Sequence, residues 1–79
     1  METPGQILRR TRLAAGIRQK ALTEILGISS PFLCVIELGK RPLPWKHIIK
    51  LPDGIREEVQ LAAERVALQE IRHGKTPIE

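Results

Sequence analysis

The clearest chemical signal in the sequence is the concentration of cationic side chains in its N-terminal part. Residues 1–50 hold nine Lys and Arg against three Asp and Glu, a balance of +6, whereas residues 51–79 hold four against six, a balance of −2. A basic surface on a small domain attracts the phosphates of nucleic acids. The pattern therefore favours binding of an anionic polymer, although small domains also carry surplus lysines without such a partner.

Nucleophiles and metal ligands are few and scattered. The single cysteine, Cys34, excludes an intrachain disulfide and a zinc site built from paired cysteines. His47 and His73 have no Cys or carboxylate at ligand spacing, so we expect both to be solvated. No catalytic triad and no glycine-rich phosphate loop is recognisable. The sequence predicts a binding protein that is not an enzyme and needs no metal, cofactor or small-molecule ligand.

Residues 19–38, which these cations surround, have the pattern of two short helices joined by a tight turn. Leu22 and Leu26 are one helical turn apart and share a face. Gly27 permits a left-handed backbone, and Ser29 can cap the helix that follows. Two such helices with buried inner edges make a helix-turn-helix unit, whose second helix fits the DNA major groove.

The remaining prolines and glycines predict three more helices and no strand, which gives an all-α fold of five helices in one domain. Thr3 and Gln6 form a capping box at the first helix, and we expect Leu8, Thr11 and Ala15 to be its inner stripe. The expected helices span residues 4–15, 18 or 19 to 26, 30–38, 44–50, and 55 to 72 or 73. We place the domain at residues 1–74, with a dimerisation helix at 55–73 and a flexible tail at 75–79.

The composition limits the other possibilities. Hydrophobic residues make up 42% of the chain, with one Phe, one Trp and no Tyr, so the core must be aliphatic. The shortage of aromatic side chains also argues against binding of single-stranded nucleic acid, whose bases stack on such side chains. No apolar run resembles a signal peptide or approaches the length of a membrane span, and we therefore expect a cytoplasmic protein with no membrane partner. A chain this short buries only about 60% of its unfolded surface, so self-association would add stability.

The predicted C-terminal helix has two apolar faces. One carries Ile55, Val59, Ala62, Ala63 and Val66, which we expect to pack on the rest of the domain. The other carries Leu61 and Leu68, a heptad apart, with Ile71 nearby. Two interpretations stay open: this second face pairs with another copy in a two-fold homodimer, or both faces wrap into one core.

The segment from residue 5 to 51 resembles the Xre/Cro/C1 family of DNA-binding regulators, which includes the lambdoid phage repressors. The resemblance implies a lambda-repressor-like domain in which Arg12 and Glu37 form a semi-buried ion pair and Gln19 binds a DNA phosphate. Small proteins of this family are common in phages and mobile elements and often repress their own operon. The matching residues are Leu8, Arg12, Ala15, Gly16, Gln19, Leu22, Gly27, Ile28, Ser29, Leu33, Ile36, Glu37, Gly39 and Lys40.

The outer face of the predicted helix over residues 30–38 is nearly apolar, where readers of bases usually carry Arg, Lys, Asn or Gln. Pro31, Val35 and Leu38 are expected to point out most directly, with Ser30 and Cys34 beside them. Three interpretations stay open. In the first, the candidate base contacts are Ser30, Pro31, Cys34 and Val35, which meet thymine methyls and make one hydrogen bond while DNA shape adds the remaining specificity. In the second, Arg18, Lys20 or Lys46 reaches the bases from the flanks. In the third, the face binds protein and not DNA.

Phosphate contacts are assigned to the side chains that flank this helix, namely Arg18, Gln19, Lys20, Ser29, Lys40, Arg41 and Lys46. The sequence thus predicts a homodimeric regulator that binds double-stranded DNA and represses transcription from an inverted repeat. The alternative is a protein-binding module, such as an antitoxin or antiactivator with the same fold. The apolar outer face favours the alternative, whereas the basic half and Gln19 disfavour it.

Overall fold

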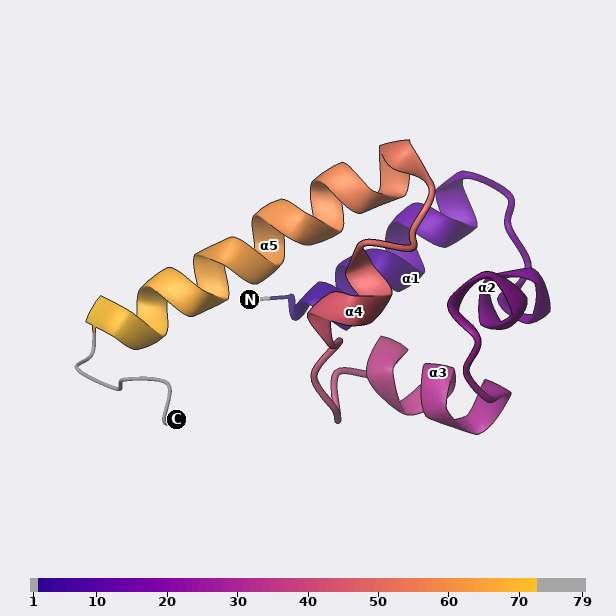
Figure 1. Cartoon of the computed structure of the whole chain (residues 1–79), viewed down its shortest axis with the longest axis horizontal. Coiled ribbons are helices and arrows are strands. Elements are labelled where there is room, and N and C mark those ends of the chain that lie inside the picture. Colours follow the sequence, from indigo (N-terminus) through magenta and orange to yellow (C-terminus); the bar gives the residue numbers. More distant parts are fainter. Residues whose placement is uncertain (1, 73–79) are drawn as a thin grey trace.

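The computed structural model describes residues 2–72, with side chains described as far as residue 68. Over this range the chain is all-α, as predicted, and no strand is present (Figure 1). Within the same range no helix combines the length and the apolar character needed to cross a membrane. The five helices are α1 (Pro4–Ala14), α2 (Gln19–Leu26), α3 (Ser30–Glu37), α4 (Trp45–Ile48) and α5 (Asp53–Arg72).

The start of α1 confirms the predicted capping box. The Thr3 hydroxyl accepts a hydrogen bond from the Gln6 backbone N–H at 3.1 Å, and the Gln6 side chain accepts one from the Thr3 N–H at 2.9 Å. Two otherwise unpaired donors at the helix start are thereby satisfied. A left-handed Gly16, with φ of 74°, follows the end of the helix.

The inner stripe of α1 differs from the prediction at one end. Leu8 is fully buried, but Ala15 is exposed, because it lies beyond the helix end and borders a shallow hollow near the start of α5. Gly5 and Arg12 complete the buried side instead. A Cβ on Gly5 would lie 1.9 Å from the carbonyl oxygen of Ile36, so only glycine lets α1 and α3 approach this closely.

The turn between α2 and α3 forms as its residues predict. Gly27 adopts the left-handed conformation at φ 70° and ψ 35°, and the Ser29 hydroxyl accepts the Phe32 N–H at the start of α3. Arg18, the N-cap of α2, makes no capping hydrogen bond with its side chain. The inner faces of the two helices meet in the core, where Leu22, Leu26, Leu33 and Ile36 are fully buried.

The C-terminal helices begin and end differently from the prediction. Helix α4 is a single turn, whereas α5 starts at Asp53 because the Arg56 N–H bonds to the Pro52 carbonyl at 2.8 Å. A carboxylate in that first turn suits the positive end of the helix. The prediction that His47 is solvated is wrong, since the side chain is 7% exposed. His73 and the tail at 75–79 lie outside the described residues.

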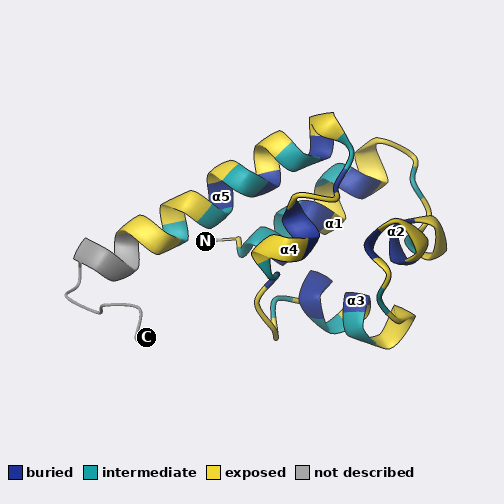
Figure 2. Ribbon diagram, in the orientation of Figure 1, coloured by how far each residue is buried: buried dark blue, intermediate teal, exposed yellow. Residues whose placement is uncertain are grey.

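Helix α5 packs on α1 through its first half and then extends past the other helices (Figure 1). Figure 2 shows its buried residues confined to that first half. Ile55, Val59 and Ala62 are buried, and Ala63 packs against the core, as predicted. Leu61 and Leu68 are 56% and 60% exposed, so these two residues do not wrap into a single core. The side chain of Ile71 lies outside the described ones.

Candidate nucleic-acid interface

A buried ion pair joins α1 to the end of α3. Arg12 Nε lies 2.8 Å from Glu37 Oε2, and Arg12 Nη2 lies 3.1 Å from Glu37 Oε1, so the guanidinium grips the carboxylate with two parallel hydrogen bonds. Arg12 is 6% exposed and Glu37 is 3% exposed. The remaining guanidinium nitrogen of Arg12 donates to the Ile17 carbonyl at 2.9 Å. This is the pair that the family resemblance implies, and it fixes the distance between the two helices.

The same carboxylate orients Gln19 at the start of α2. Gln19 Nε2 donates to Glu37 Oε1 at 3.2 Å. Because an ionised carboxylate only accepts hydrogen bonds, the amide must turn its NH₂ group toward Glu37. One N–H of that group is used, and the second is left to donate to another acceptor. The hydrogen bond also places the start of α2 beside the end of α3.

The exposed face of α3 is short and mainly apolar. Ser30, Pro31 and Cys34 are exposed, and so is Leu38, which caps the helix. Cys34 is the centre of this face, one turn from each of the others, whereas Val35 is half-buried at its edge. The expectation that Val35 points out directly is therefore corrected. The sequence placed the inward direction midway between Leu33 and Ile36, but Phe32 also packs against the core, which turns the inner face toward Ile36 and Phe32 and draws Val35 to its border.

The candidate phosphate contacts fall on four segments around α3. The side chains of Arg18, Lys20 and Ser29 are exposed, as are those of Lys40, Arg41 and Lys46, and Gln19 is half-buried. The residues of α2 and those after α3 both border the C-terminal end of α3, as the Gln19 hydrogen bond requires. Lys46 precedes His47, whose ring contacts Phe32 in the first turn of α3.

His47 is a buried polar residue that sequence reasoning missed. Its ring meets Phe32 edge to face at a centroid distance of 6.3 Å, and its Nδ1 has no hydrogen-bond partner in the described structure. Burial lowers the pKa of His47, and the positive charges of Lys46 and Lys50 lower it further. The sequence feature that could have indicated this burial is the spacing of four residues between His47 and each of Leu43 and Leu51, which are both buried.

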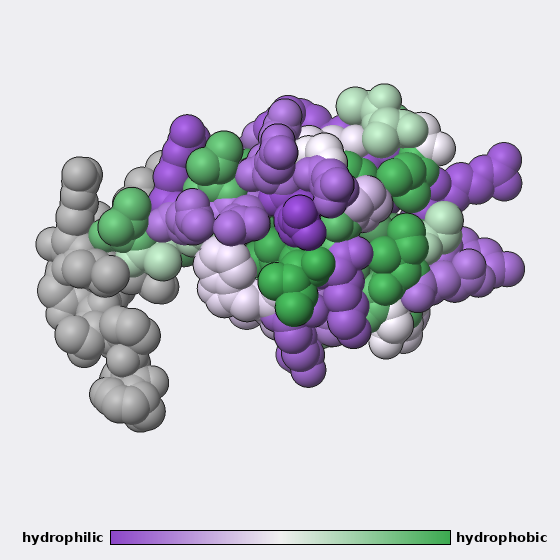
Figure 3. Space-filling model, turned by 45° about the horizontal axis from the view of Figure 1, so that its top comes forward, coloured by the Kyte–Doolittle hydropathy of each residue, from purple (hydrophilic) through white to green (hydrophobic). Residues whose placement is uncertain are grey.

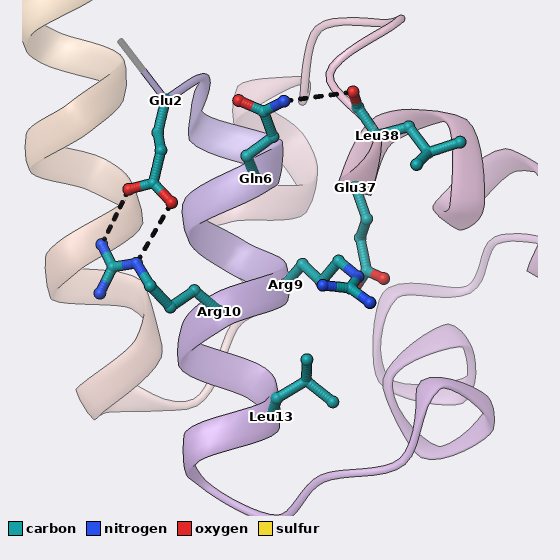
Figure 4. Close-up of a pocket in the computed structure, with 7 residues that line it drawn as sticks. All are labelled: Glu2, Gln6, Arg9, Arg10, Leu13, Glu37 and Leu38. Carbon is teal, nitrogen blue, oxygen red and sulfur yellow. Dashed lines mark hydrogen bonds and ion pairs between the residues drawn. The ribbon is translucent and has the colours of Figure 1, made fainter.

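A shallow groove of about 640 Å³ between α1 and the end of α3 was also not predicted from the sequence. Figure 4 shows Arg9 and Leu13 projecting from α1 toward α3, while Glu2 and Arg10 pair on the other flank of α1. Gln6 Nε2 donates to the Leu38 carbonyl at 3.3 Å and closes one end. Leu13 and Leu38 also line the groove, and each is 52% exposed.

The described part of the chain holds no group of three side chains suited to a metal ion. Comparison with known proteins does not supply a function, because no protein-family model, curated protein or solved structure matches this chain. A function for this protein therefore has to come from its own residues and their arrangement.

Proposed function

We propose that this protein is a regulator of the Xre/Cro/C1 type that binds double-stranded DNA as a homodimer and represses transcription by occupying an inverted-repeat operator. The observation that carries the proposal is the exposed face of α3, whose C-terminal end is bordered by two cationic segments. Arg18 and Lys20 stand at the start of α2, and Lys40 and Arg41 follow the end of α3. A short helix presented between phosphate-binding groups is the arrangement that docks in a major groove.

Phosphate contacts supply the affinity in this proposal. Gln19 is positioned by Glu37 with one N–H left to donate, and an amide of this kind suits a phosphate oxygen. Ser29 accepts the Phe32 N–H through its oxygen, so its hydroxyl hydrogen is left to donate as well. The exposed cations contribute by charge and release counterions from the DNA. These contacts orient the protein and carry little sequence information.

Base reading rests on few groups, because the exposed face of α3 has little hydrogen-bonding capacity. The Ser30 hydroxyl can bond a base edge, Pro31 and Cys34 can contact thymine methyls, and Val35 contributes from the edge of the face. Sequence-dependent DNA shape would supply the remaining discrimination. We therefore expect specificity to be modest for each half-site and to depend on dimerisation.

The exposed leucines of α5 provide the dimer contact. Figure 3 shows apolar side chains along this helix, separated by hydrophilic ones. Leu61 and Leu68 are one heptad apart, so they lie on one stripe of the helix, away from the buried Val59. Pairing of two copies through this stripe would bury them, and would present two α3 helices to successive turns of one DNA face.

Salt-dependent DNA binding tests the proposal. Fluorescence anisotropy with a labelled duplex should show affinity that falls steeply between two salt concentrations. Arg41→Ala should weaken binding to all duplexes alike and lower the salt slope by about 0.9, the value for one phosphate contact. Arg65→Ala, which removes an exposed arginine from α5, is the matched control and should change neither quantity. Binding that is independent of salt would contradict the proposal.

Base contacts are tested separately. Cys34→Ala and Val35→Ala should change the preference between duplex sequences more than the affinity for a random duplex. An unchanged preference in both variants would show that α3 does not read bases through these side chains.

A second candidate function is a protein-binding module, and one observation favours it. Leu13 and Leu38 extend the exposed apolar surface at the end of α3. Apolar side chains of a protein partner would gain from contact with this surface, whereas a DNA phosphate backbone would not. Apolar protein binding should be insensitive to salt, so the anisotropy series above also distinguishes the two functions.

A further inference from the structure

The groove between α1 and the end of α3 has the properties of a docking site. Leu13 on α1 and Leu38 at the end of α3 are each 52% exposed, and Figure 4 shows them at opposite ends of the hollow with Arg9 between them. Single exposed leucines are ordinary on protein surfaces, but two that border one hollow are typical of a binding surface. Covering both would remove apolar area from water, which favours association.

The groove is already formed in the free protein. Gly5 holds α1 against the backbone of Ile36, and Gln6 bonds the Leu38 carbonyl. The Arg12–Glu37 pair locks the same two helices from the buried side. A ligand therefore does not have to order the site, and little of its binding free energy is lost on conformational entropy.

The charges that line the groove favour an acidic ligand. Arg12 compensates Glu37, and Arg10 is paired with Glu2, its Nη2 3.2 Å from Glu2 Oε1 and its Nε 3.3 Å from Oε2. Within residues 2–68, no carboxylate lies at ion-pair distance from Arg9, so its charge remains uncompensated. The Glu2–Arg10 pair lies on the other flank of α1, so Arg9 is the cation that a ligand carboxylate meets in the groove.

We infer that this groove binds an acidic, leucine-bearing segment of a partner protein. One apolar side chain of the segment covers Leu13, a second covers Leu38, and a carboxylate between them pairs with Arg9. DNA fits less well, because a sugar-phosphate backbone matches the arginines but leaves the two leucines uncovered. Leu38 also belongs to the exposed face of α3, so an occupied groove blocks the end of that face. Such a partner would release the protein from DNA, and this consequence alone rests on the proposed function.

Peptide selection against the full chain tests the inference. A displayed library of random 12-residue peptides is selected on the immobilised protein, and the enriched peptides are synthesised with a fluorescent label. We expect the enriched peptides to share a Leu, Ile, Phe or Trp next to Asp or Glu. Leu13→Ser and Arg9→Glu should each weaken binding at least tenfold, and replacing the acidic residues of the peptide by Gln or Asn should do the same.

Matched controls outside the groove separate it from general surface effects. Ile49→Ser and Arg65→Glu make comparable changes at exposed positions and should leave peptide binding unchanged. Circular dichroism of every variant confirms that the fold is retained, as expected for exposed sites. The inference is overturned if no acidic-apolar peptides are enriched, or if the Leu13→Ser variant binds them as well as the unchanged protein.

Duplex binding completes the test. Leu13→Ser should leave affinity for a duplex unchanged, whereas an enriched peptide should displace the duplex from the unchanged protein. A tenfold loss of duplex binding in Leu13→Ser would assign the groove to the DNA interface instead and contradict the inference. Peptide binding in a protein that binds no duplex would leave the docking site standing and refute the proposed function. Duplex binding in a protein that binds no groove-dependent peptide would leave the proposed function standing and refute the docking site.

Discussion

Replacing Glu37 with glutamine should destabilise the fold strongly. The change leaves the guanidinium of Arg12, which is 6% exposed, facing a neutral amide in the interior. Removing one partner of a buried ion pair costs about 3–5 kcal/mol, because the remaining charge is neither solvated nor paired. In a domain of this size each kcal/mol lowers the melting temperature by roughly 4–8 °C, so the fall should be about 12 °C or more. Thermal melts followed by circular dichroism measure it.

Two further variants make this result interpretable. Glu2→Gln breaks the exposed pair with Arg10, whose worth is about 0–1 kcal/mol, and serves as the matched control. The double change of Arg12→Met with Glu37→Leu should recover most of the stability, because apolar replacements of a buried pair are often neutral. A Glu37→Gln protein that melts within a few degrees of Glu2→Gln would refute the assignment of Arg12–Glu37 as a desolvated pair.

Three other predictions concern particular residues of the core and of α5. Gly5→Ala should cost about 1–3 kcal/mol by forcing α1 away from α3, whereas Gly54→Ala, with open space around its Cβ, should be neutral or stabilising in urea unfolding. The pKa of His47 is lower in the folded protein than in the unfolded chain, so on acidification the unfolded chain takes up a proton at this histidine before the folded protein does. The free energy of unfolding should therefore fall as the pH drops below the ordinary value of 6.5, and level off below the pKa of His47 in the folded protein. His47→Leu should remove that part of the pH dependence, and a persisting slope would assign it to other groups. Leu61→Glu and Leu68→Glu should each give monomers in sedimentation, and a dimer that survives both changes would place the interface elsewhere.

The features that the sequence predicts well depend on residues close together in the chain. The capping box of Thr3 and Gln6, the left-handed Gly27 and the Ser29 cap each involve a few neighbouring positions. Their conformations follow from backbone sterics and local hydrogen bonds, whatever surrounds them. The helix order and the buried face of α5 follow in the same way from the spacing of apolar residues.

The features that the sequence missed depend on residues far apart in the chain. The need for glycine at position 5 arises from the carbonyl of Ile36, and the burial of His47 arises from its packing beside Phe32. Ala15 has helical spacing from Leu8 but lies where no side chain covers it. The groove of Leu13 and Leu38 exists only because two helices pack side by side. Local patterns do not contain these relations, since tertiary packing decides them.

Selection of random duplexes by the full chain tests the central claim most directly. Enriched sequences should form an inverted repeat, with half-sites about 10 base pairs apart from centre to centre, as expected for two α3 helices on one face of DNA. Binding to the selected duplex should exceed binding to a shuffled one at a salt concentration that suppresses non-specific contacts. Failure to enrich any sequence, with all duplexes lost alike as salt rises, would contradict sequence-specific recognition by α3.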